Sequence, residues 1–136
     1  MENADNKIPI EGLLLKWVDI SVGIQNKTYS VIYELDKSIA FVKGFQITTD
    51  RDSLVYGRGT VKIEVNKQEV VPEGYEAKQL YSTPNVAVNE RFFIRGGRIP
   101  AGNGQVKFEY TDTNDASLQF EAYRVRLILD CVVKGF

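Results

Sequence analysis

Val106-Lys107-Phe108-Glu109-Tyr110 is the stretch of this sequence that most clearly decides its fold. Apolar and charged side chains alternate in it without a break. Because successive side chains of a β-strand point to opposite faces, this pattern predicts a strand with one face buried and one in water. Strands of this half-buried kind are typical of antiparallel sheets.

The same alternation recurs outward along the chain in both directions. Residues 61–65 repeat it, and so do residues 123–127, which run on into two further apolar residues. Segments rich in Thr, Val, Ile, Tyr and Phe are predicted strands as well; they span residues 13–20, 28–34, 39–49 and 92–95. No segment carries the i, i+3, i+4, i+7 apolar stripe of a long amphipathic helix.

Turn residues separate these strands. Residues 66–68 and 100–104 contain the Asn and Gly that tight turns favour. The Gly-Arg-Gly of residues 57–59 predicts a bulge or bend. A strand is predicted to end at residues 72–75, and residues 73–90 are expected to form a long connection with a short helical turn.

The predicted fold class is therefore all-β: one antiparallel β-sandwich, jelly-roll-like, with about eight strands. The chain of 136 residues is long enough to bury a core without a metal or disulfide. Residues 12–136 are predicted to form the domain, and residues 1–11 a polar, flexible N-terminal arm.

Charge and composition exclude some classes of function. With 17 basic and 18 acidic residues the net charge is −1, whereas proteins that bind duplex nucleic acid need a basic surplus to neutralise phosphates. We see no signal peptide and no apolar run of membrane-spanning length, so neither nucleic acid nor membrane is expected as a partner. The single cysteine, Cys131, cannot form an internal disulfide, which favours a reducing compartment such as the cytoplasm.

No set of residues predicts catalysis, a metal or a cofactor. The chain has no histidine, so the commonest general base and most imidazole-based zinc sites are excluded. Cys131 stands in an apolar strand and is expected to be a buried thiol. The oxygen-rich segments 50–52 and 112–115 do not match a calcium-binding loop and are interpreted as turns. We therefore predict that the protein is not an enzyme.

The charges are unevenly placed along the second half of the chain. Residues 91–107 hold four basic residues and no acid, whereas residues 109–123 hold four acids and no base. Since the strand between them separates two ends of a sandwich, a basic and an acidic pole are expected, although ordinary scatter of charge is the competing interpretation. The residues predicted to contact other copies or proteins are Arg91, Arg95, Arg98, Asp112 and Asp115.

Three segments resemble a known group of proteins. Residues 45–50 (FQITTD), 72–78 (PEGYEAK) and 100–104 (PAGNG) resemble the auxiliary (decoration) capsid or head-fibre β-sandwich proteins of crAss-like tailed phages. The resemblance covers roughly residues 41–133. It implies a structural role in the virion, assembly in the host cytoplasm, and contact with capsid or other virion proteins as a homo-oligomer or lattice member.

A carbohydrate-binding module is the alternative function, because the same architecture often carries sugar sites on a face or a loop. Its contact residues would be loop aromatics, which can stack on sugar rings; the candidates are Tyr75, Tyr81, Phe92 and Phe93.

Overall fold

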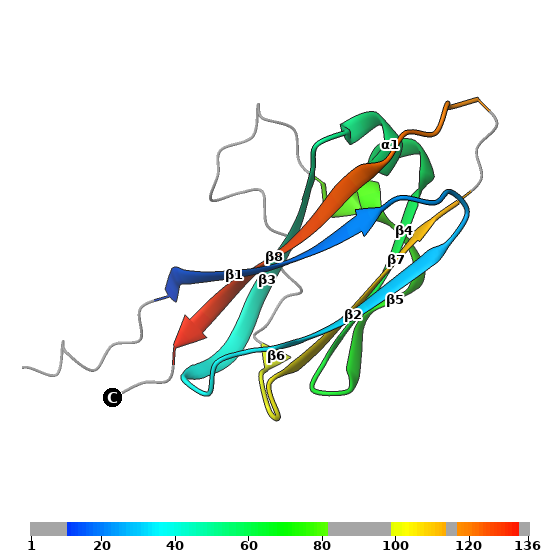
Figure 1. Cartoon of the computed structure of the whole chain (residues 1–136). Coiled ribbons are helices and arrows are strands. Elements are labelled where there is room, and N and C mark those ends of the chain that lie inside the picture. The colour runs from blue at the N-terminus through cyan, green and yellow to red at the C-terminus, as the bar shows by residue number, and fades with distance from the viewer. Residues whose placement is uncertain (1–10, 82–98, 114–116, 134–136) are drawn as a thin grey trace, which may run out of the picture.

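The structure is a computed structural model that describes residues 11–81, 99–113 and 117–133. Eight strands form two four-stranded antiparallel sheets that face each other (Figure 1). The predicted β-sandwich is confirmed. In chain order the elements are β1 (Glu11–Val22), β2 (Thr28–Glu34), β3 (Ile39–Thr49), α1 (Asp52–Arg58), β4 (Gly59–Val65), β5 (Gln68–Glu76), the 3₁₀ turn η2 (Ala77–Gln79), β6 (Ile99–Pro100), β7 (Gln105–Asp112) and β8 (Tyr123–Val133).

The order of the strands is that of a jelly roll. One sheet runs β1-β8-β3-β6 and the other β2-β7-β4-β5. First pairs with last, second with seventh, third with sixth and fourth with fifth. The chain therefore behaves as one long hairpin that is rolled up, which is why most consecutive strands lie in opposite sheets.

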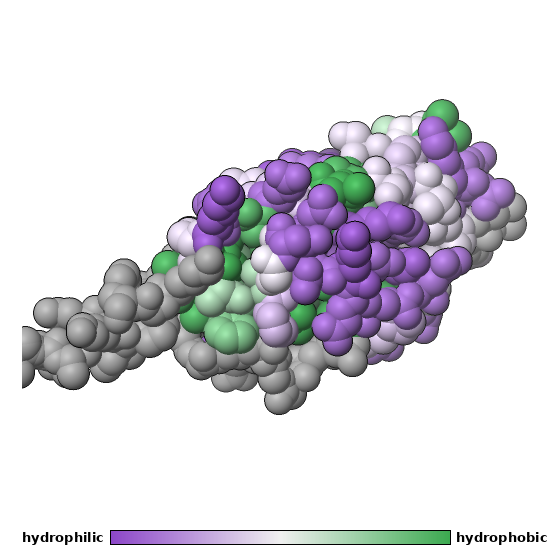
Figure 2. All heavy atoms as spheres, turned by 90° about the horizontal axis from the view of Figure 1, so that it is seen from below, coloured by the Kyte–Doolittle hydropathy of each residue, from purple (hydrophilic) through white to green (hydrophobic). Residues whose placement is uncertain are grey.

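The core lies between the two sheets and is filled largely by alternate residues of β4, β7 and β8. In β7 and β4 every second side chain is buried, as the period of two requires. The outward side chains of the same strands form ion pairs between Lys62 and Glu64 at 3.2 Å and between Lys107 and Glu109 at 3.1 Å. On the face of the molecule seen in Figure 2, hydrophilic residues cover a large part of the described surface and hydrophobic ones show as smaller areas.

The turns that the sequence predicts at residues 66–68 and 100–104 are present, and both lie at the same end of the sandwich. Asn66 and Lys67 have φ angles of 53° and 64°, the left-handed pair of a type I′ hairpin turn. The Asn66 side chain accepts a hydrogen bond from the backbone N–H of Asn103 at 3.0 Å. This bond ties the β4–β5 turn to the β6–β7 turn.

Three sequence predictions need correction. The expected bend at residues 57–59 is instead the end of helix α1 followed by the start of β4. Strand β5 does not end at Pro72 but continues to Glu76; it is an edge strand, where proline is tolerated, and its register shifts. Glu11, placed in the N-terminal arm, is the first residue of β1 and pairs with Val132.

Other predictions stand or lie outside the described residues. The short helical turn expected after residue 73 is η2. The predicted strand at residues 92–95 and the arm residues 1–10 lie outside the described part of the chain. Within that part, no helix is long and apolar enough to cross a membrane.

Candidate functional site

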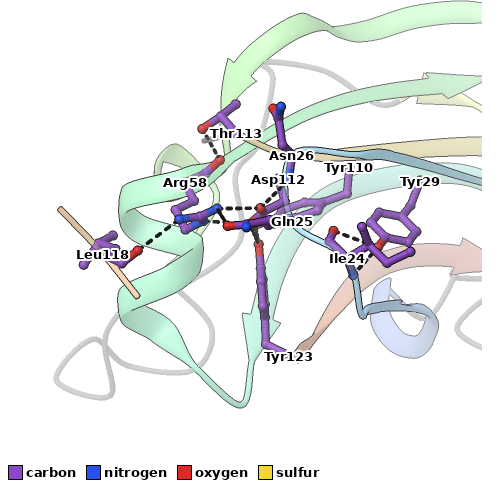
Figure 3. A network of polar contacts seen from close by, with 10 residues as sticks. All are labelled: Ile24, Gln25, Asn26, Tyr29, Arg58, Tyr110, Asp112, Thr113, Leu118 and Tyr123. Atoms are coloured by element: carbon purple, nitrogen blue, oxygen red, sulfur yellow. Dashed lines mark hydrogen bonds and ion pairs between the residues drawn. The ribbon is translucent and has the colours of Figure 1, made fainter. Parts of the chain in front are cut away.

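A buried ion pair lies at the end of the sandwich that carries α1 (Figure 3). Arg58 is the last residue of α1 and Asp112 the last of β7, and both side chains are fully buried. The guanidinium Nε donates to Asp112 Oδ1 and Nη2 donates to Oδ2, each at 3.0 Å. Such two-point pairing is the strongest geometry available to arginine and a carboxylate.

The remaining hydrogen-bonding capacity of the carboxylate is also used. The Tyr123 hydroxyl donates to Asp112 Oδ1, and the backbone N–H of Asn26 donates to Oδ2 at 3.0 Å. The hydroxyls of Tyr110 and Tyr123 lie 2.8 Å apart in a hydrogen bond. Burial alone raises the pKa of Asp112, but the hydrogen bonds from Arg58 and Tyr123 outweigh it and hold the pKa below its ordinary value.

The guanidinium joins segments that are distant in the sequence. Its Nη1 donates to the carbonyl of Leu118 at 3.2 Å, and its carbon lies 5.6 Å from the centre of the Phe120 ring. The backbone carbonyl of Arg58 accepts from both the N–H and the hydroxyl of Thr113. The cluster thus holds the β1–β2 loop, α1, the end of β7 and the segment of Leu118 and Phe120 together.

This geometry changes the expected acidic pole. Asp112, predicted as an exposed contact residue, is buried because its charge is paired with Arg58. The other two described acids of residues 109–123 also have basic partners: Glu109 pairs with Lys107 at 3.1 Å and Glu121 with Arg51 at 3.5 Å. Each described acid of this segment therefore has a basic partner, and of the three Glu121 is the one that remains largely exposed. The predicted contact residues Arg91, Arg95, Arg98 and Asp115 lie outside those residues.

Cys131 is the buried thiol that the sequence predicts, whereas the oxygen-rich segments are not simply turns: Asp52 begins α1, Asp112 ends β7, and residues 114–116 lie outside the described residues. Cys131 is buried, and burial raises the pKa of its thiol to about 12. Asp50 accepts a hydrogen bond from the backbone N–H of Arg124 at 2.9 Å. Among residues 11–81, 99–113 and 117–133, no cluster of three or more acidic or cysteine side chains could hold a metal.

An exposed apolar surface lies along the edge strand β1. We name Leu15 and Trp17 the β1 surface, since both project outward on the same face of the strand and are exposed, Trp17 by 53%. A concavity of about 340 Å³ is lined by these two residues together with Lys16 and Tyr33. Among the strands that the structure describes, β1 has β8 on one side and none on the other.

The Trp17 ring is held in place from the sheet. The guanidinium of Arg126 lies 5.4 Å from the ring centre and donates to both carboxylate oxygens of Asp19, at 2.7 and 3.1 Å. Lys16 points the other way, and its Nζ pairs with Asp36 at 2.7 Å. A large exposed indole that is already oriented loses little conformational freedom when it binds a partner.

A second concavity lies beside α1. It has a volume of about 500 Å³ and is lined by Asp52, Ser53, Tyr56, Gly57, Tyr81 and Leu118. Tyr56 is 59% exposed, and the Lys78 ammonium lies 5.4 Å from its ring centre. The Tyr81 hydroxyl donates to Asp52 at 3.4 Å. The concavity therefore combines the Tyr56 ring with the Asp52 carboxylate and the Tyr81 hydroxyl.

Comparison with known proteins does not add a relative. No family model, curated protein or solved structure matches the chain.

Sequence reasoning missed Trp17 and Tyr56 as candidate contact residues. Trp17 follows the run Leu13-Leu14-Leu15 and Lys16, and that leucine run hides the alternation of β1. Tyr56 lies on a helix that the sequence does not predict. Of the predicted loop aromatics that the structure describes, Tyr75 and Tyr81, the second lines the α1 concavity. Phe92 and Phe93 lie outside the described residues.

Proposed function

We propose that this protein is a non-enzymatic structural component of a phage virion, an auxiliary or decoration protein on the capsid surface. The observation that carries the proposal is the β1 surface: an oriented, exposed tryptophan and leucine beside the open edge of a twelve-residue strand. Tryptophan is strongly enriched among the residues that dominate protein–protein binding energy.

The partners in this proposal are capsid or other virion proteins, and the assembly takes place in the host cytoplasm. A net charge of −1 is poorly suited to binding phosphate backbones. A catalytic role lacks support because the chain has no histidine, and Asp112, the carboxylate with the most hydrogen-bond donors around it, is already paired with Arg58.

The test is binding to a capsid shell. The major capsid protein encoded nearest to this gene would be assembled into shells and sedimented with the purified protein. Trp17→Ala should weaken binding by about thirtyfold or more, the effect of losing a dominant contact residue. Tyr56→Ala is the matched control, because it removes an equally exposed aromatic ring from another part of the molecule. Absence of a capsid gene from the genome, or equal binding by both variants, would contradict the proposal.

A carbohydrate-binding module is the second candidate, and the α1 concavity favours it. An exposed aromatic ring beside a few convergent polar groups is a common arrangement for a small-ligand site. On a glycan array this function predicts binding that Tyr56→Ala abolishes and Trp17→Ala preserves. The two functions therefore make opposite predictions for the same pair of variants.

A further inference from the structure

Strand β2 is the least protected edge of the sandwich. Proteins usually prevent unwanted pairing at sheet edges with bulges, proline, charged side chains or very short strands. Three of the four edge strands carry such a device: β1 has a register shift and the inward-pointing Lys16, β5 contains Pro72 and the left-handed Gly74, and β6 has two residues. β2 has none of them between residues 28 and 33.

The geometry of β2 is that of a regular strand ready to pair on its open side. All seven of its residues pair with β7 without a register shift. Residues 28–33 read Thr-Tyr-Ser-Val-Ile-Tyr, which combine high β-propensity with no charge, no proline and no glycine. Within the described residues, no strand lies on the other side of β2.

The core is also incompletely covered at this edge. The inward-facing residues of β2 are only partly buried, whereas their pairing partners on β7 are fully buried; the pairs are Tyr29 with Tyr110, Val31 with Phe108, and Tyr33 with Val106. On the outer face, Ile32 is 61% exposed. One more strand beside β2 would cover apolar area on both faces of the sheet.

We propose that this strand is β2 of a second copy of the chain, paired antiparallel about a two-fold axis, so that the β2-β7-β4-β5 sheet continues into the partner as eight strands. Antiparallel pairing fits the charges at the two ends of the strand. Lys27 precedes β2 and Glu34 ends it, so each end of an antiparallel pair holds one basic and one acidic residue, whereas each end of a parallel pair holds two residues of the same sign. Because Lys27 and Glu34 project to opposite faces of the sheet, this is an attraction between the strand ends and not a direct cross-strand side-chain pair.

The register follows from the faces of the strand. Centring the axis on Val31 keeps inward residues opposite inward residues and places Tyr29 across from Tyr33 of the second copy. Thr28 then lies across from Glu34 of the second copy, with Lys27 at the next position. The pairing is self-complementary, as a two-fold interface requires. It stands on the geometry of β2 alone and does not depend on a role in a virion.

The mass of the full-length purified protein in solution tests the pairing. Sedimentation equilibrium at about 100 µM should give twice the mass of one chain, since a small interface is expected to have a Kd on the order of micromolar. Ile32→Lys places a charge near the two-fold axis and should weaken dimerisation at least tenfold. Ile24→Lys is the matched control: it adds the same charge at a site of similar exposure, 59%, outside the strand, and should stay dimeric.

A charge swap tests the antiparallel orientation. Lys27→Glu and Glu34→Lys should each weaken dimerisation about three- to tenfold, because each puts like charges together at both ends of the pair. The double variant should recover the wild-type mass. Circular dichroism of every variant checks the fold, and recovery in the double variant cannot come from a folding defect.

The proposal is overturned if the wild type stays monomeric, if Ile32→Lys remains dimeric, or if the charge-swapped double variant fails to recover. Trp17→Ala should leave the dimer intact. Loss of capsid binding by that variant therefore reports on the proposed function alone, and loss of dimerisation by Ile32→Lys reports on β2 alone.

Discussion

Replacing Asp112 with alanine would leave the guanidinium of Arg58 buried without its counter-charge. Arginine cannot release its proton, so the positive charge would remain in a fully buried position. Breaking a buried pair in this way costs about 3–5 kcal/mol, a large part of the roughly 5–15 kcal/mol that stabilises a typical domain. We expect Asp112→Ala to lower the free energy of unfolding by that amount.

The opposite change, Arg58→Met, should have a different pH dependence. In the wild type the pKa of Asp112 is lowered, so its contribution to stability is present above the ordinary carboxyl pKa of about 4 and is lost as the pH falls through the lower folded value. Without Arg58, burial is expected to raise the folded pKa of Asp112 instead. The loss in free energy of unfolding caused by Arg58→Met should therefore be largest at neutral pH. It should become smaller as the pH falls and the Asp112 carboxyl takes up a proton.

Urea denaturation followed by far-UV circular dichroism, at several pH values, measures both effects, with the slope m checked for constancy. Asp19→Ala is the control, because Asp19 has the same two-point geometry with Arg126 but lies on the surface. Exposed pairs contribute under about 1 kcal/mol. Equal losses for Asp112→Ala and Asp19→Ala, or a pH-independent cost for Arg58→Met, would refute the reasoning.

Three further predictions concern stability and reactivity. Gly59→Ala should cost about 1–3 kcal/mol in urea unfolding, because a Cβ there would overlap the Tyr110 ring, whereas Gly23→Ala, with open space around it, should change stability by under about 0.5 kcal/mol. Lys67→Gly should stabilise the protein by about 0.5–1 kcal/mol in the same assay, since it relieves a left-handed residue in a type I′ turn; a loss of stability would contradict this. Cys131 should react with a thiol reagent only after unfolding, because it is buried and its pKa is raised to about 12; rapid reaction of the native protein at neutral pH would show that the site opens.

The strands of this protein are determined mainly by its sequence. The segments predicted at residues 28–34 and 39–49 are β2 and β3 with the same bounds. The reason is that both signals are local: β-branched and aromatic residues favour these two strands, and alternation of apolar and polar side chains in the others forces a strand to bury one particular face. The left-handed Asn66 is likewise a local preference, visible in a single residue type.

Only the tertiary structure decides how those strands are joined and which charges meet. Helix α1 has seven residues, too few to be stable alone, and it forms because Leu54, Val55 and Arg58 are buried against the sheets. The sequence cannot distinguish a solvated Asp112 from one paired with an arginine 54 positions away. In the same way, no local pattern tells an edge strand from a central one, so the open edge of β2 becomes visible only once β7 is seen to pair with one side of it.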